Sequence, residues 1–340
     1  MPADLRCLRP EGPPSAGGYL PIAEHGVIGD LHTIALVGVE GTIDWYRPGR
    51  SDAPSMFGAL LDARRGGHWS LCPAGGHWHS RQRYVPGTNV LVTRFMSDEG
   101  EFEIGDFMPV GRGPGTVVRR VVGLRGEPHL VMEVEPRFDC SCRPRSARLR
   151  DNGALIVSAG RAFALHAPLR LRPTRAGVQA KFRVAPGEVV TLALCPTHVP
   201  PPVGDLYEAT IAFWRARLAD HGYRGPWREP VERSALALEL LDRAAAGVLV
   251  DRDGPQPHAG AAARFRRAET LARAGQPTDA RVTFEAALAS ANHLGLMSES
   301  VGPDGEQLGD FPHAATHREL ISAAHALDAP PGRQGPSGKT

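Results

Sequence analysis

The chain lacks the long apolar runs that membrane spans and signal peptides require. Residues 1–18 instead contain Pro10, Pro13, Pro14 and Gly17, and we expect them to form a disordered tail. Residues 328–340 are rich in Pro, Gly and Ser and receive the same interpretation. Without an export or anchoring segment, the sequence predicts a cytoplasmic protein with no membrane contact.

A strong excess of one charge is also missing. The formal net charge of +2 comes from 39 basic and 37 acidic residues, which we interpret as mixed along the chain. Neither nucleic acid nor an anionic membrane is therefore expected as a partner. Hydrophobic residues make up 42% of the chain, which suffices for a sizeable core in 340 residues.

Cysteine is scarce, and the five present show no spacing typical of a disulfide framework. We expect free thiols in a reducing cytoplasm. Histidines near the second cysteine lack paired metal-ligand spacing, and His313 and His317 lack the acidic residue of a zinc-binding helix, so no metal or other cofactor is expected. The residues concerned are Cys7, Cys72, Cys140, Cys142, Cys195, His68, His77 and His79.

The first part of the chain consists of short extended runs separated by Gly, Pro or Asp/Asn turns. This pattern, from Tyr19 to about Pro202, predicts an antiparallel β-sandwich. Its densest stretch predicts a hairpin that turns at Glu40-Gly41 and resumes at residues 42–46. A short helix over residues 56–61, capped by Ser55, should follow.

The hydrophobic period changes to that of helices near Asp205. A linker helix is expected within residues 203–224, with Tyr207, Ile211, Trp214 and Leu218 on one apolar face. Further helices are predicted over residues 231–246, around Phe265, and over residues 278–294.

The hairpin stretch also carries a family resemblance. The segments GVIGD, ALV, GTIDW, RSDAPSMFGALLD and RRGGHW follow one another at nearly ungapped spacing between residues 26 and 69. They resemble the amino-terminal domain of bacterial glycoside hydrolase family 15, the glucoamylase and trehalase type. The resemblance implies a β-sandwich followed by an (α/α)6 barrel that hydrolyses α-glucosidic bonds of trehalose or maltooligosaccharides with inversion.

The barrel part of the resemblance is incomplete. PWREPVERSALALELL resembles the first barrel helix, but DRDGPQPHAGAAAR follows Val250, and the family's sugar-binding and general-acid segments do not appear. The closing segment, which begins GLMSES, resembles the one that supplies the general base, and it places that base at Glu299. Ser300 stands where the family usually has a second acidic residue. The sequence thus predicts a truncated member with a sandwich over residues 19–202 and a barrel remnant over residues 225–327.

The candidate site is accordingly half of a catalytic pair. Inverting hydrolysis needs two carboxyl groups on opposite faces of the sugar, and only Glu299 is identified, so we expect weak or no activity. Asp44, Trp45 and Asp52 are candidate sugar contacts, as is Asp30, although turns and strand ends would explain the carboxylates equally well. The alternative is a non-catalytic carbohydrate-binding or subunit-interaction protein. Because the missing barrel helices would leave apolar helix faces exposed, we expect the helical part either to fold back onto the sandwich or to form a homodimer.

Overall fold

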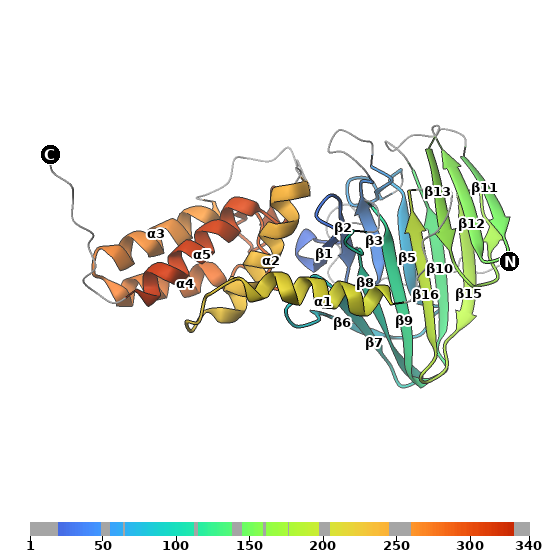
Figure 1. Cartoon of the computed structure of the whole chain (residues 1–340), viewed down its shortest axis with the longest axis horizontal. Helices are drawn as coiled ribbons and strands as arrows, with labels where there is room; N and C mark the ends of the chain where they lie inside the picture. The colour runs from blue at the N-terminus through green and yellow to red at the C-terminus, as the bar shows by residue number, and fades with distance from the viewer. Residues whose placement is uncertain are drawn as a thin grey trace. The chain divides into compact units, whose positions relative to one another are not determined.

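The computed structural model describes residues 20–48, 55–63, 65–111, 115–137, 145–158, 161–175, 177–196, 205–244 and 260–329. These residues form two compact units (Figure 1). The first, the sandwich unit, contains the described residues up to Arg217 together with residues 239–244. The second, the helical unit, contains Leu218–Leu238 and the described residues from Gly260 onward.

The sandwich unit contains two antiparallel eight-stranded sheets. The chain enters it through the short 3-10 helix η1 (Ile22–Glu24). One sheet has the order β1 (His25–Gly29), β2 (Ile34–Gly38), β3 (Thr42–Tyr46), β5 (His68–Pro73), β10 (His129–Glu135), β15 (Val178–Arg183) and β14 (Arg172–Pro173), with β4 (Phe57–Gly58) paired to β3. The other has the order β11 (Arg145–Arg150), β12 (Gly153–Ser158), β13 (Arg161–His166), β16 (Val189–Cys195), β9 (Val117–Gly126), β8 (Gly100–Phe107), β7 (Leu91–Met96) and β6 (His79–Tyr84).

One buried ion pair links the two sheets. Arg119 and Asp106 are fully buried and form a two-pronged pair, with Arg119 Nε 2.8 Å from Asp106 Oδ1 and Nη2 3.2 Å from Oδ2. The same guanidinium donates to the carbonyl groups of Trp69 and Gly41 in the opposite sheet and its turn, at 2.9 and 2.8 Å. Each of the three guanidinium nitrogens therefore has an acceptor, which reduces the cost of burying the charge.

The predicted hairpin is confirmed, and the helix predicted after it is wrong. Strands β2 and β3 pair, and Gly41 turns the chain with a φ of +82° that glycine adopts without strain. Residues 57–58 instead form β4, because the backbone N–H of Met56 donates to Tyr46 and that of Gly58 donates to Gly67. These partners in the sheet replace the local bonds that a helix would require.

In the described part of the chain, five helices and a small hairpin follow the sheets. They are α1 (Leu206–Ala219), α2 (Arg228–Ala244), α3 (Ala261–Arg273), α4 (Pro277–Leu288) and α5 (Ala314–Asp328), with β17 (Ser300–Val301) and β18 (Gln307–Leu308) between the last two helices. Among the described residues, no helix is both long and apolar enough to cross a membrane. The prediction of a β-sandwich followed by helices is confirmed.

Helix α4 ends earlier than its apolar pattern predicts. The period suggested a helix to residue 294, but polar side chains take over the backbone groups after Leu288. Ser290 donates its hydroxyl to Ala287, and the Asn292 side chain accepts from Leu294 N at 3.0 Å and Leu296 N at 2.9 Å. Asn292 therefore folds the chain back on itself, which a hydrophobic period cannot reveal.

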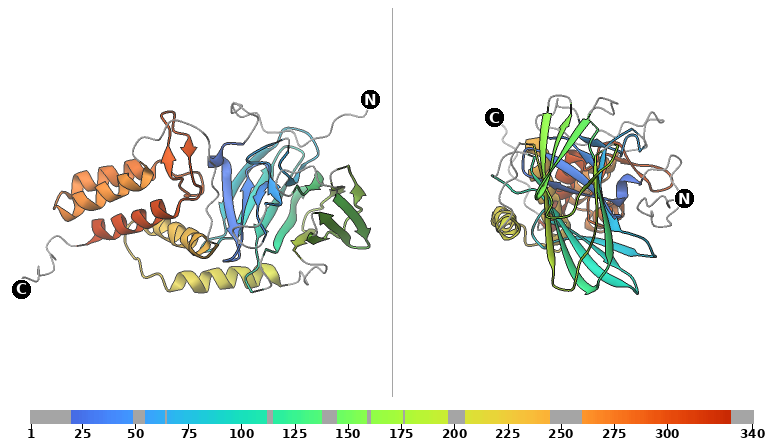
Figure 2. Two further views of the ribbon diagram at one scale, coloured as in Figure 1. Left: turned by 90° about the horizontal axis from the view of Figure 1, so that it is seen from above. Right: turned by 90° about the vertical axis from the view of Figure 1, so that its right-hand side faces the viewer.

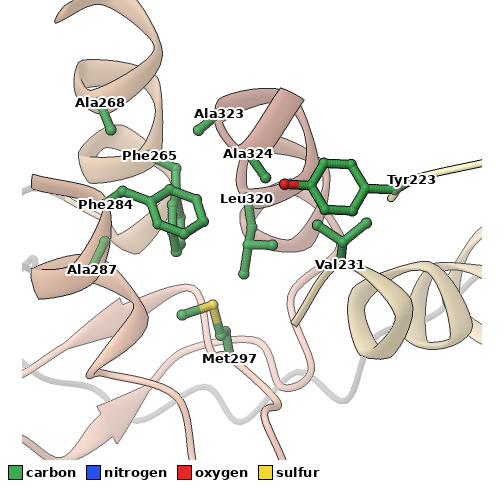
Figure 3. Close-up of a cluster of buried hydrophobic side chains, with 10 residues drawn as sticks. All are labelled: Tyr223, Val231, Phe265, Ala268, Phe284, Ala287, Met297, Leu320, Ala323 and Ala324. Atoms are coloured by element: carbon green, nitrogen blue, oxygen red, sulfur yellow. The ribbon is translucent and has the colours of Figure 1, made fainter. Parts of the chain in front are cut away.

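The helical unit has its own apolar core, which α3, α4 and α5 enclose (Figures 2 and 3). Phe265 and Phe284 meet edge to face at 5.4 Å, and Trp227 packs on Phe284 at 4.7 Å. Ten buried side chains form this core: Tyr223, Val231, Phe265, Ala268, Phe284, Ala287, Met297, Leu320, Ala323 and Ala324.

This core changes the expectation about exposed helix faces. The apolar stripes of the two predicted helices were expected to face empty positions, but Val231, Phe284 and Ala287 are all buried in the core. Among the described helices, the one large hydrophobic side chain that is exposed is Val282, at 61%. The apolar surface proposed for a homodimer is therefore not exposed on these stripes.

The expectation of free thiols is wrong for one residue. Cys72 is disulfide-bonded, whereas Cys195 is free and buried. Cys7, Cys140 and Cys142 lie outside the described residues. Free thiols were one reason for predicting a cytoplasmic location, and Cys72 removes that support.

Candidate functional site

Glu299 lies in the helical unit, at the start of the β17–β18 hairpin. Its side chain is exposed, while its neighbours Ser298 and Ser300 are buried. The carbonyl group of Glu299 accepts a hydrogen bond from the N–H of Ala261, at the first residue of α3. The loop is thereby fixed at its backbone and presents the carboxylate to solvent.

Asp310 is bound to Glu299 in both directions. Glu299 N donates to the Asp310 carbonyl at 2.9 Å, and Asp310 N donates to Glu299 Oε2 at 3.3 Å. Gly309 makes this approach possible, because a Cβ at that position would lie 2.6 Å from the same carboxylate oxygen, and its φ is +76°. Glu299 and Asp310 therefore meet at the base of the hairpin.

Sequence reasoning missed this partner, although a pattern for it exists. Pro303, Asp304 and Gly305 form a turn sequence, and Gly305 has a φ of +85°. A hairpin centred there pairs Ser300 with Leu308, which brings residues 299 and 310 together.

The two carboxyl groups differ in their electrostatics. Burial raises the pKa of Asp310, the Glu299 charge raises it further, and His313 opposes both effects. With a raised pKa, Asp310 keeps its proton to a higher pH than an ordinary aspartate does.

The buried side chain of His317 holds the loop that leads to Glu299. His317 Nε2 accepts a hydrogen bond from the backbone N–H of Met297, so Nδ1 carries the proton and donates to Ser234 Oγ at 2.9 Å. This tautomer cannot activate the Ser234 hydroxyl as a base. Burial lowers the pKa of His317 to about 3, with Arg233 and His313 adding to the effect. His317 is therefore a neutral structural residue.

Three hydroxyl groups near Glu299 also hold the backbone of this loop. Ser298 donates to the Ser300 carbonyl at 2.6 Å, and Thr316 donates to the Ser298 carbonyl at 3.2 Å. Ser300 is buried and donates to the Leu308 carbonyl at 3.3 Å. Its hydroxyl therefore closes the hairpin instead of facing solvent.

The candidate sugar contacts belong to the sandwich unit. Asp30 accepts bonds from the N–H groups of His32, Thr33 and Gly115, at 2.9, 2.7 and 2.6 Å, which orders the turn after β1. Trp45 is only 5% exposed on β3. Asp52 lies outside the described residues. The sugar-contact role of these residues stays a prediction.

Asp44 forms a buried ion pair. Its Oδ2 lies 2.8 Å from His25 Nε2, and His25 Nδ1 lies 3.0 Å from the Pro21 carbonyl, so both ring nitrogens can donate. Burial alone lowers the pKa of His25, but the charge and hydrogen bond of Asp44, with smaller contributions from Glu40 and Ile22, raise it to about 9. His25 is therefore an imidazolium at neutral pH.

Among the described residues, no group of three or more His, Cys, Asp or Glu side chains could hold a metal ion. His68 pairs with Glu133 at 3.5 Å. His77 and His79 are exposed.

Comparisons with known proteins place the chain in a family. The family model "Trehalase-like, N-terminal" matches residues 17–190, about half of the chain. A trehalase from Mycolicibacterium smegmatis is 30% identical over 276 residues, covering 70% of this chain and 41% of the relative. A trehalase from Mycobacterium tuberculosis is 28% identical over 274 residues, with coverages of 70% and 40%. The chain thus spans about two fifths of the length of these curated relatives.

Among solved structures, a bacterial glucoamylase complexed with acarbose aligns with a TM-score of 0.46 and 8% identity, covering 88% of this chain and 55% of that one. The family assignment rests on the sequence matches. Together with the antiparallel sheets in the matched part of the chain, these sequence matches show that the chain belongs to the trehalase-like family of the glycoside hydrolase family 15 type.

Proposed function

We propose that this chain is a protein of α-glucoside metabolism whose site descends from an inverting glycosidase, with Glu299 at the general-base position. Its helices represent the first and last parts of an (α/α)6 barrel. The substrate class in this proposal is trehalose or maltooligosaccharides, and the relatives named trehalases support the first of these. We propose further that the chain by itself is catalytically impaired.

The observation that carries the proposal is the fixed, exposed carboxylate of Glu299. Its backbone is bonded to Ala261 and Asp310, and its loop rests on the buried His317. A general base needs such positioning to hold a water molecule against the sugar.

Asp310 does not replace the missing general acid. Inverting hydrolysis places its two carboxyl groups roughly 6.5 to 9.5 Å apart, on opposite faces of the scissile bond. Asp310 N lies 3.3 Å from the Glu299 carboxylate, and both residues extend from the base of one hairpin. We infer from this common origin that they would approach a sugar from the same side. A base without an opposed acid contributes roughly 10² to 10⁴-fold, well below glycosidase rates.

The test compares the purified chain with Glu299→Gln and Asp310→Asn variants on trehalose, maltose and starch. We expect no glucose release above the Glu299→Gln control, measured by a coupled glucose assay. Robust turnover that disappears in Glu299→Gln would contradict the impaired state. If it also disappeared in Asp310→Asn, Asp310 would become the first candidate for the acid.

The non-catalytic binding alternative predicts exposed aromatic platforms for sugar rings. Among the described residues, the exposed large hydrophobic side chains are all aliphatic, and Trp45 is buried. Calorimetric titration with trehalose, maltoheptaose and acarbose separates the two proposals. Tight binding that survives Glu299→Gln would favour a binding protein with a site elsewhere.

A further inference from the structure

The basic residues of the chain are not evenly mixed with the acidic ones. Between residues 137 and 183, eleven residues are Arg or Lys and two are Asp or Glu. The whole chain has 39 basic and 37 acidic residues, so the remainder carries an acidic excess. The near-zero net charge that argued against an anionic partner hides this separation.

The fold gathers this segment at one end of the sandwich. Strand β11 is the last strand of one sheet, and β14 with β15 ends the other. Figure 1 shows β11, β12, β13 and β15 beside one another at that end. Seven exposed basic side chains lie there, and we call them the basic end: Arg148, Arg150, Arg170, Arg172, Arg175, Lys181 and Arg183.

Few opposing charges neutralise the basic end. Arg183 alone among the seven lies within 4 Å of a described carboxylate, that of Glu127 at 3.9 Å, and both side chains are 62% exposed. On the neighbouring strand β10, Glu133 pairs with His68 and Glu135 pairs with Arg137. An exposed ion pair at such a distance contributes little, so the positive potential remains available to a partner.

We propose that the basic end binds an anionic polysaccharide bearing carboxylate or sulfate groups. Six of its seven cations are arginines, whose planar fork matches two-oxygen anions better than lysine does. Binding single-stranded nucleic acid relies on stacking of bases on aromatic rings, and the large hydrophobic residue exposed on β11 is Leu149, at 46%. This surface is separate from Glu299 and goes beyond the proposed glycosidase ancestry.

The experiment uses fluorescein-labelled heparin oligosaccharide as the probe and the full chain as the protein. The patch variant is Arg148→Glu/Arg150→Glu. The matched control is Arg264→Glu/Arg267→Glu, which makes the same change in net charge on exposed positions of α3. Fluorescence anisotropy at about 50 mM salt should show an affinity loss of about tenfold or more in the patch variant and less than about twofold in the control.

Equal losses in both variants would overturn the proposal, because net charge alone would then explain binding. Failure of the unmodified chain to bind heparin would overturn it as well. Competition by duplex DNA of matched charge at equal potency would reject the polysaccharide assignment in favour of nucleic acid. A milder variant, Arg148→Gln/Arg150→Gln, guards against misfolding and should lose about half as much binding free energy as the charge reversal.

Discussion

The sandwich unit and the helical unit each bury a histidine completely, and the two histidines carry opposite charge states. His25 sits against Asp44 and is held as a cation, with a pKa of about 9. His317 sits between Ser234 and the Met297 amide and is held neutral, with a pKa of about 3. Burial alone disfavours the charge in both, so the partner decides the outcome.

The comparison extends to how each unit holds itself together. Two buried ion pairs, Arg119–Asp106 and His25–Asp44, lie inside the sandwich unit. In the helical unit, Phe265, Phe284 and Leu320 pack in an apolar core. The sandwich should therefore respond to loss of a charge, and the helical unit to loss of volume.

The largest expected loss of stability comes from removing a buried charge in the sandwich unit. Arg119→Met leaves the Asp106 carboxylate buried without its partner and should cost about 3 to 5 kcal/mol of unfolding free energy, measured by urea denaturation. The double variant Arg119→Met/Asp106→Leu should recover part of that loss. A cost below about 1 kcal/mol in the single variant would show that the pair does not organise the sandwich.

The helical unit should respond to a cavity. Phe284→Ala removes a fully buried ring between Phe265 and Trp227 and should cost about 3 to 4 kcal/mol. Val282→Ala, two residues away on the exposed face, should change stability by less than about 0.5 kcal/mol. Thermal unfolding followed by circular dichroism measures both. Equal effects would mean that the inward and outward faces of α4 are wrongly assigned.

The charged histidine predicts a loss of stability in alkali. Because the folded pKa of His25, about 9, exceeds the unfolded 6.5, its contribution is complete below pH 6.5 and is lost as pH rises through 9. The loss should be on the order of 3 kcal/mol, measured as urea midpoints between pH 6.5 and 9.5. Asp44→Asn should flatten this dependence. An unchanged slope in that variant would assign the effect to another group.

The neutral histidine predicts the reverse dependence over a different range. The folded pKa of His317 lies below 6.5, so its contribution is complete above pH 6.5 and declines as pH falls toward 3. Between pH 7 and 5 the unfolding free energy should fall by about 2 kcal/mol. His317→Gln, which does not titrate, should remove that part of the slope. A variant with the same slope as the unmodified chain would contradict the neutral state.

Much of the fold could be predicted because turns and hydrophobic periods are local. Gly41 marked its hairpin, and the apolar spacing of Ile211 and Trp214 located α1, where both side chains are buried. The period could not locate the end of α4, because the chain folds back after this helix through a hydrogen bond to the Asn292 side chain. Hydrophobic patterns describe faces, whereas helix ends depend on particular polar groups.

The polar contacts of Asp44 and Glu299 could not be predicted from the sequence for a related reason. Alternation shows which face of a strand a residue occupies, but it does not show the register with a distant strand. The sequence offered Asp44 as a candidate sugar contact, but it could not show that the strands place Asp44 beside His25, 19 residues earlier. The position of Glu299 followed from family resemblance, while its contact with Asp310 required the hairpin register.

The hydrogen bonds that Arg119 makes to distant segments affect how the sandwich unit assembles. Its acceptors come from three segments, at Asp106, at Trp69 and at Gly41, which lie 13, 50 and 78 residues away along the chain. A partly assembled sandwich would enclose the guanidinium before all acceptors had arrived, and an unpartnered buried cation costs several kcal/mol. Intermediates with one sheet formed are thereby disfavoured. A single residue thus promotes cooperative folding, so that the two sheets should melt in one transition.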